Sequence, residues 1–200
     1  MRPQPLWPRL KNNFNALREG AAVAAINPLA SKPDDRKEKI IMKDHAIRAV
    51  ELFFEGYNCA QSVLGAFAED GEVGLGIDFK TAVRLTSGLG GGLSRQRELC
   101  GAINGMCIAA GILFGYDEAT DTEGKKQLYA DVQRLCASFR EINGSIVCRE
   151  LLGARKGQDT APAPDARTAE YYRTRPCAKM IHDAAAVLDS EIARRAAGKD

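Results

Sequence analysis

Apolar residues recur at the spacing of α-helices along most of the chain. The clearest stripe, with steps of four, three, four and three residues, is formed by Leu128, Val132, Leu135, Phe139 and Ile142. Steps of seven, three and four residues separate Ile40, Ile47, Val50 and Phe54. Residues at such steps lie on one face of an α-helix, whereas no segment shows the alternation of a half-buried strand. The pattern therefore predicts an all-α fold.

Capping residues and glycines divide this pattern into five or six helices. Asn58 and Asp78 are typical N-caps, and the second of the two helices they begin runs into the glycines at 88–92. Another helix is predicted from about 95 to 115, and residues 99–116 carry no charge although they include four glycines. We expect this uncharged helix at the centre of the bundle, surrounded by the others.

The chain divides into an N-terminal extension and one helical domain. Three early prolines and the linker-like sequence PLASKPDD at 28–35 set residues 1–35 apart as an extension, helical in part at best. Residues 36–197 form the predicted domain, because about 160 residues can bury a core without disulfides.

The composition and net charge argue against several classes of protein. Lys and Arg total 28 and Asp and Glu 26, so the net charge is +2. Nucleic-acid binders rely on a clustered positive field, which this balance does not offer. The N-terminus lacks the uninterrupted apolar run of a secretory signal, and Asn104 and the glycines disfavour a membrane span at 99–116. We therefore expect a cytoplasmic protein whose cysteines are thiols, metal ligands or transient redox groups.

Three of the six cysteines fall at predicted helix starts. Cys59 follows the cap Asn58, Cys148 follows a break at 143–145, and Cys177 follows Pro176, a residue favoured in the first turn. Backbone N–H groups and the positive end of the helix dipole stabilise a thiolate at this position. These three thiols are therefore candidates for chemistry.

The other three cysteines lie further inside their helices. Cys100 falls in a second turn if Ser94 caps its helix, yet Gly101, Ala102 and Gly105 beside it would let another backbone or an inorganic cluster approach. Cys107 and Cys136 lie mid-helix and are assigned to packing. Cys107 is about 10.5 Å along the helix from Cys100, beyond the limit of about 7 Å for a disulfide.

Other candidate features receive structural interpretations. No cysteine pair is spaced C-x-x-C, so a site would have to be assembled from four separate helices. The glycines at 88–92 lack nucleotide-binding spacing and are expected to break a helix near Cys100, offering N–H groups to sulfur. Asn104 is either a core amide or a donor beside the site. His45 and His182 are expected to be surface or satisfied residues.

Four stretches carry a family resemblance: GYNCAQSVLGAF (56–67), SGLGGGLSRQRELCGAING (87–105), SIVCRELLG (145–153) and RPCAKMIHDAA (175–185). From about residue 45 to 190 the chain resembles the redox-active protein family named for the pattern C_GCAxxG_C_C. The resemblance implies that Cys59, Cys100, Cys148 and Cys177 are the functional cysteines. Related domains fused to cytochromes imply electron transfer, with an iron–sulfur cluster as the carrier.

Four functions are compatible with these cysteines: two redox mechanisms and two further alternatives. The favoured one makes Cys59, Cys100, Cys148 and Cys177 the ligands of an iron–sulfur cluster, with Gly101, Asn104 and Gly105 around it, because four cysteines exceed the needs of one disulfide. Alternatively, the same four cysteines catalyse thiol–disulfide exchange. A zinc site with four cysteine ligands and a non-redox helical interaction protein with scattered, buried thiols stay open. The expected partner is a redox protein, and a homodimer is left open.

Overall fold

The computed structural model of the protein describes residues 44–73, 75–153 and 160–198. In these ranges the regular elements are helices, and the only extended pairing is an isolated bridge between Leu99 and Val147. The prediction of an all-α fold is confirmed. The extension predicted for residues 1–35 lies outside the described residues.

Five helices of ten or more residues form the frame of this part of the chain: α2 (His45–Phe54), α3 (Cys59–Ala68), α6 (Gly101–Phe114), α7 (Thr122–Asn143) and α10 (Cys177–Ala196). Shorter elements connect them: α4 (Phe79–Leu85), the 3-10 turn η2 (Ser87–Leu89), α5 (Gly90–Leu93), α8 (Cys148–Leu151) and α9 (Ala169–Thr174). The long helices are the ones that the apolar periodicity predicts, whereas α9 falls where the sequence shows no clear pattern.

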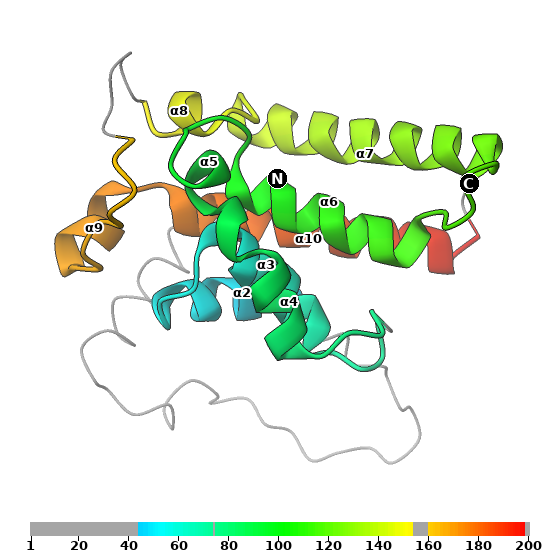
Figure 1. The fold of residues 1–200 in the computed structure, drawn as a ribbon, viewed down its shortest axis with the longest axis horizontal. Coiled ribbons are helices and arrows are strands. Elements are labelled where there is room, and N and C mark those ends of the chain that lie inside the picture. Colours follow the sequence, from blue (N-terminus) through cyan, green and yellow to red (C-terminus); the bar gives the residue numbers. More distant parts are fainter. Residues whose placement is uncertain (1–43, 74, 154–159, 199–200) are drawn as a thin grey trace, which may run out of the picture. The chain divides into compact units, whose positions relative to one another are not determined.

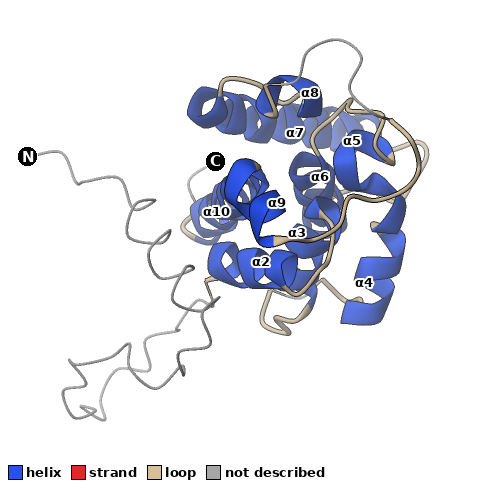
Figure 2. Ribbon diagram, turned by 90° about the vertical axis from the view of Figure 1, so that its left-hand side faces the viewer, coloured by secondary structure: helices blue, strands red, loops and turns tan. Residues whose placement is uncertain are grey.

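Helix α6 occupies the centre of the bundle, as its uncharged sequence predicts. It packs against α3, α7 and α10, and α2 covers α3 and α10 (Figures 1 and 2). The approach of α6 to α3 requires a glycine, because a Cβ atom at Gly105 would stand 2.6 Å from the carbonyl oxygen of Ala60. Gly105 therefore serves helix packing. Within the described residues, no helix has the length and apolarity needed to span a bilayer.

The predicted caps are present. Asn58 accepts hydrogen bonds from the first turn of α3, and the side chain of Gln61 accepts one in return from the Asn58 N–H, which completes a capping box. Asp78 caps α4 through the N–H of Thr81 at 3.0 Å. These caps fix where α3 and α4 begin, and with α3 the position of Cys59.

The start of α6 differs from the prediction. The helix expected from residue 95 begins at Gly101, and Ser94 donates to the carbonyl of Gly88 at 2.8 Å instead of capping it. Positive φ angles at Ser94, Arg95 and Arg97 are incompatible with a helix there. This segment is held outside the helix because its end pairs with a later part of the chain.

Helix α7 is the least buried of the long helices. Leu135 and Phe139 from the predicted stripe are buried, whereas Ile142 at its end is 54% exposed. The helix ends at Gly144, whose φ of 83° provides the predicted break.

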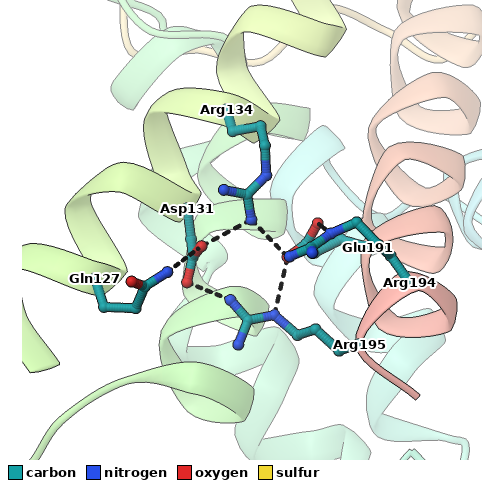
Figure 3. A network of polar contacts seen from close by, with 6 residues as sticks. All are labelled: Gln127, Asp131, Arg134, Glu191, Arg194 and Arg195. Carbon is teal, nitrogen blue, oxygen red and sulfur yellow. Dashed lines mark hydrogen bonds and ion pairs between the residues drawn. The ribbon is translucent and has the colours of Figure 1, made fainter. Parts of the chain in front are cut away.

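Helix α7 is tied to α10 by a network of ion pairs (Figure 3). Its centre consists of two buried carboxylates, Asp131 of α7 and Glu191 of α10. Arg134 bridges them at 2.7 and 2.8 Å, and Arg195 also contacts both. Together with Arg194, these arginines hold the pKa of Glu191 at about 2. The network therefore stabilises this contact as long as its carboxylates are ionised.

Candidate functional site

Four cysteines lie at the starts of four helices. Cys59, Cys148 and Cys177 are the first residues of α3, α8 and α10, as predicted. Cys100 directly precedes α6 and does not fall in its second turn, which corrects the prediction. In Figure 1, α5, α8 and α9 gather at the end of the bundle where α10 begins. Each sulfur thus lies near backbone N–H groups that have no partner within their helix.

The fold brings these four cysteines into one cluster. Cys59 and Cys177 line the same pocket, and each shifts the pKa of the other. Cys100 interacts electrostatically with both Cys59 and Cys148. Within the described ranges, no three His, Cys, Asp or Glu side chains are placed so that they could hold one metal ion.

Backbone pairing brings Cys100 beside Cys148. The N–H of Cys100 donates to the carbonyl of Ile146 at 2.9 Å, and the N–H of Cys148 donates to Glu98 at 2.6 Å. Gly92 lets this pair approach the glycine segment, because its φ is +68° and a Cβ atom there would stand 2.6 Å from the Cβ of Cys148. The residues after α7 are therefore a structural part of the cluster.

A second close approach brings α6 against the start of α3. A Cβ atom at Gly101 would stand 3.0 Å from the Cβ of Cys59. Asn104, one turn later, donates to the carbonyl of Leu89 at 3.3 Å and so holds the glycine segment, not a sulfur. The backbone N–H of Gly91, in that segment, helps to lower the pKa of Cys59. The glycines thus supply an N–H group to Cys59, where one was expected near Cys100.

A pocket of about 400 Å³ opens over the cluster. Cys59, Cys148 and Cys177 contribute to its wall, whereas the buried Cys100 does not. Among the residues that line it, one carries a carboxylate, Asp165, and four carry guanidinium groups: Arg95, Arg97, Arg167 and Arg175. The pocket therefore favours thiolates and anionic ligands over neutral or cationic ones.

Each arginine has a defined place around the sulfurs. Arg97 is hydrogen-bonded to Cys148. Asp165 holds two others, Arg95 at 3.0 Å and Arg175 at 2.5 Å. Arg167 stacks on the ring of Tyr171 at 4.8 Å and donates to the backbone carbonyl of Tyr57. These contacts fix positive charge beside the cluster.

The interaction between Cys59 and Cys177 shifts their pKa values in opposite directions. The hydrogen bond from Cys177, with the charge of Arg167 and the N–H of Gly91, lowers the pKa of Cys59 to about 7 against the effect of burial. The same contact, together with burial, raises the pKa of Cys177. The directions of these shifts favour the thiolate at Cys59 and the protonated thiol at Cys177.

The two remaining thiols of the cluster are protonated. Burial, followed by the charge of Cys59, raises the pKa of Cys100 to about 12. Burial also raises the pKa of Cys148, although Arg97 opposes this. The cluster thus consists of one acidic thiol at the pocket wall and less acidic thiols around it.

Part of the pocket comes from residues that the sequence did not single out. Asp165, Arg167 and Tyr171 lie in and just after the loop that precedes the last cysteine. Burial, and then the neighbouring Cys177, raises the pKa of Tyr171 to about 12, so its ring forms a neutral wall. No spacing marks these residues, and the only signal was the number of arginines close to Cys177.

Both histidines lie in other surroundings. His45 is buried and hydrogen-bonded to Asp189 at 2.6 Å and to Asp70 at 3.1 Å. His182 contacts the neighbouring Asp183 at 3.1 Å. The two ring systems are thus satisfied by carboxylates, as the sequence interpretation expected.

Cys107 and Cys136, which the sequence assigns to packing, contact each other. Cys107 lies on α6 and Cys136 on α7, two helices that pack against each other, and each thiol shifts the pKa of the other. Both side chains are half-buried. The six cysteines therefore comprise a cluster of four and a separate pair.

Comparison with known proteins agrees with the pattern of the four clustered cysteines. A family model described as "Putative redox-active protein (C_GCAxxG_C_C)" matches residues 57–191, a range that includes all four. An "Uncharacterized protein" of Archaeoglobus fulgidus is 34% identical over 111 residues, which are 52% of this chain and 71% of that protein. No solved structure matches the chain. The chain belongs to the C_GCAxxG_C_C family of redox-active proteins.

Proposed function

We propose that the protein is a thiol–disulfide redox protein whose reactive pair is Cys59 and Cys177. The observation that carries the proposal is that both cysteines line the wall of one pocket, where each shifts the pKa of the other. Thiolates are the nucleophiles of disulfide exchange, and Cys59 is the most acidic of the four clustered thiols. Cys177 is close enough to act as the resolving thiol.

The exchange proceeds in two steps. The Cys59 thiolate attacks one sulfur of a substrate disulfide, forming a mixed disulfide and releasing the other sulfur as a thiolate that takes up a proton. Cys177 then loses its proton and attacks the sulfur of Cys59, which expels the second substrate thiolate. Two electrons pass from the cysteine pair to the substrate, and a redox partner protein returns the pair to the dithiol.

The pocket indicates the kind of substrate. Four arginines against one carboxylate favour a disulfide that carries carboxylates near its sulfurs. The volume of about 400 Å³ accommodates a small molecule or the tip of a protein loop. Cys100 lies behind the pocket wall and does not meet the substrate in this mechanism.

The test is a thiol map of the protein after oxidation. The anaerobically purified protein is treated with one equivalent of a small disulfide, its remaining thiols are alkylated, and its peptides are identified by mass. We expect a disulfide between Cys59 and Cys177, and its loss in Cys59→Ser. Continued alkylation of both residues after oxidation would overturn the proposal.

A second candidate is an iron–sulfur cluster held by Cys59, Cys100, Cys148 and Cys177. The gathering of four thiols supports it, since four thiolates are the usual ligand set, and the neighbouring arginines would balance their charge. When bound, the cluster would supply one-electron transfer. The protein's own contribution would be the N–H of Gly91 and the guanidinium of Arg97, each directed at a ligand sulfur.

The donor positions do not favour a single zinc ion. Zinc requires its sulfur ligands at about 2.3 Å from one centre, and no three donor side chains of the described residues are so placed. A cluster distributes its ligands over several irons, so it accepts sulfurs that are further apart. A zinc ion with four cysteine ligands would require the four sulfurs to be drawn together.

Anaerobic purification separates these candidates. Iron and labile sulfide with visible absorption, all lost in Cys100→Ala, would support the cluster. Zinc without colour would support the zinc site. A colourless, metal-free protein that forms the Cys59–Cys177 disulfide is the result expected from the leading proposal.

A further inference from the structure

We propose that Arg95 and Arg175 form a carboxylate-binding site in the pocket, and that Asp165 competes with the substrate for it. The proposal deepens the proposed function and rests on it, since the ligand is taken to be a carboxylate of the disulfide substrate. It starts from one contact. The Oδ2 atom of Asp165 lies 3.0 Å from Nη1 of Arg95 and 2.5 Å from Nη2 of Arg175. The two guanidinium groups therefore converge on the position of a single carboxylate oxygen.

This ion-pair group belongs to the wall of the pocket that holds the reactive thiols. All three side chains line the same cavity of about 400 Å³ as Cys59 and Cys177. Arg175 precedes Cys177 by two residues, so the carboxylate-binding site lies next to the start of α10. A small disulfide bound in this pocket can therefore meet the thiols and at the same time place a carboxylate between the two arginines.

Both arginines are held by contacts other than those with Asp165. The guanidinium of Arg175 stacks on the ring of Tyr171 at 4.7 Å. Arg95 packs against the glycine segment, where a Cβ atom at Gly91 would stand 3.4 Å from the Cγ atom of the arginine. These contacts keep the guanidinium groups in place for a ligand when the Asp165 carboxylate moves away.

Asp165 is held less firmly than the arginines that it contacts. Its side chain is 36% exposed, whereas that of Arg95 is 12% exposed. It lies outside any helix, in the segment before α9, and two residues ahead of Arg167, whose contacts anchor this segment. A partly exposed ion pair contributes little to stability, because water screens it. Replacing the Asp165 carboxylate by that of a ligand therefore costs little.

The site distinguishes substrates by their charge. The group that the fold itself places between the guanidinium groups is a carboxylate, so a ligand carboxylate can take over both contacts without rearrangement. A neutral disulfide offers nothing to replace these contacts, and it has to bind beside Asp165. Asp165 is thus a specificity-determining residue that favours disulfides with a carboxylate.

Octanedioate is the probe. It matches the length of a dithiodipropionate disulfide, which has a carboxylate at each end, but has no sulfur to exchange. Its binding to the full chain is measured by calorimetry in a chloride buffer, beside that of its uncharged diamide. We expect Asp165→Asn to bind octanedioate about five- to tenfold more tightly, because the internal competitor has lost its charge. Arg175→Gln should weaken binding at least about tenfold, and Arg95→Lys, which keeps the charge without the planar fork, about threefold.

Glu170→Gln is the matched control, because it changes the net charge by the same amount at an exposed ion pair with Arg173, outside the pocket. Its affinity for octanedioate should change less than about twofold. Misfolding does not increase affinity, so the gain in Asp165→Asn tests the proposal even where an arginine variant is unstable.

Three results would overturn the proposal: unchanged or weaker binding of octanedioate by Asp165→Asn, an equal gain for the diamide, and tighter binding of inorganic phosphate than of octanedioate by the unmodified chain. Because octanedioate does not react with thiols, these results do not depend on the thiol map that tests the proposed function. A chain that binds octanedioate as expected but forms no Cys59–Cys177 disulfide would retain the carboxylate-binding site and lose the exchange mechanism.

Discussion

In two places in this protein, the pKa of a cysteine is lowered to about 7 mainly by a second thiol: Cys177 acts on Cys59, and Cys107 acts on Cys136. The surroundings of the two pairs differ. Cys59 and Cys177 begin helices at the wall of an arginine-rich pocket. Cys107 and Cys136 lie mid-helix at the edge of a packing contact.

The difference shows what a thiol pair needs in order to act on a substrate. A partner thiol makes the largest contribution to the lowered pKa of each cysteine, and nearby arginines add to it. It provides neither a cavity nor a field that would bind a ligand. At Cys59, the pocket and its arginines add both. We therefore expect substrate turnover at the first pair and not at the second.

The largest expected effect is the loss of turnover when Cys59 is removed. Cys59→Ser should lower the rate of disulfide reduction at least about 100-fold, because serine is a poor nucleophile near neutral pH. The matched variant Cys136→Ser should change this rate less than about twofold. Reduction of a small dithiobenzoate disulfide is followed by absorbance. Equal losses in both variants would remove the distinction between the pairs.

Next in size is the shift of Cys59 acidity when its donor is removed. Alkylation of Cys59 by iodoacetamide should rise as the pH increases through about 7. Cys177→Ala removes the hydrogen bond and should raise this midpoint by about one to two pH units, whereas Arg167→Ala should raise it by about half a unit. The rate is read from the peptide 49–80, which contains Cys59 alone among the cysteines.

The same experiment compares the two pairs directly. The peptide 135–140 reports Cys136 in the same sample. Its midpoint should respond to Cys107→Ala and not to Cys177→Ala. A common shift of both peptides would indicate a change in the whole fold and would contradict two separate pairs.

Local signals predicted most of the helical frame and three cysteine positions. The caps Asn58 and Asp78 and the break at Gly144 depend on residues a few positions away, so the sequence reveals them. The start of α6 does not follow from such signals. It is decided by the pairing of Cys100 with Ile146, which lies far along the chain.

The residues that the sequence analysis did not identify also depend on contacts with distant parts of the chain. On its own helix, Cys136 has the position of a packing residue. Its interaction with Cys107 arises only because α6 and α7 pack together in the fold. Asp165 and Arg167 fall in a loop without periodicity and reach the pocket through tertiary contacts. Cysteine position within a helix therefore predicted the helix starts at Cys59, Cys148 and Cys177 but gave no sign of the interaction between Cys107 and Cys136.

One prediction tests whether the ion-pair network around Glu191 stabilises the helices without affecting the reactive thiols. Helix α10 carries Cys177 at its start and Glu191 in its ion-pair network. The pKa of Glu191 is lowered from 4.5 to about 2, so its contribution is complete above pH 4.5 and is lost as the pH falls toward 2. Glu191→Gln should lower the free energy of unfolding by about 2 kcal/mol at pH 7, and by almost nothing near pH 2.

Urea unfolding at several pH values checks this. The exposed Glu141 on α7 provides the control, because Glu141→Gln should leave the free energy of unfolding within about 0.5 kcal/mol at each pH. Alkylation of Cys59 should be unchanged in Glu191→Gln. A loss of stability that stays constant from pH 7 to pH 2 would contradict the ionic origin.

The smallest expected effect comes from adding one methyl group at either of two glycines of α6. At Gly101 a Cβ atom would stand 3.0 Å from the Cβ of Cys59 and 3.1 Å from the carbonyl oxygen of Leu89, whereas at Gly111 nothing lies within 4 Å. Gly101→Ala should therefore cost about 1 kcal/mol and alter the alkylation rate of Cys59. Gly111→Ala, one turn beyond Cys107, should gain about 0.5 kcal/mol, because alanine favours the helix, and should leave both thiol pairs unchanged. If both substitutions stabilise the protein alike and leave Cys59 unaffected, the close approach of α6 to α3 is not what holds Cys59 in its cluster.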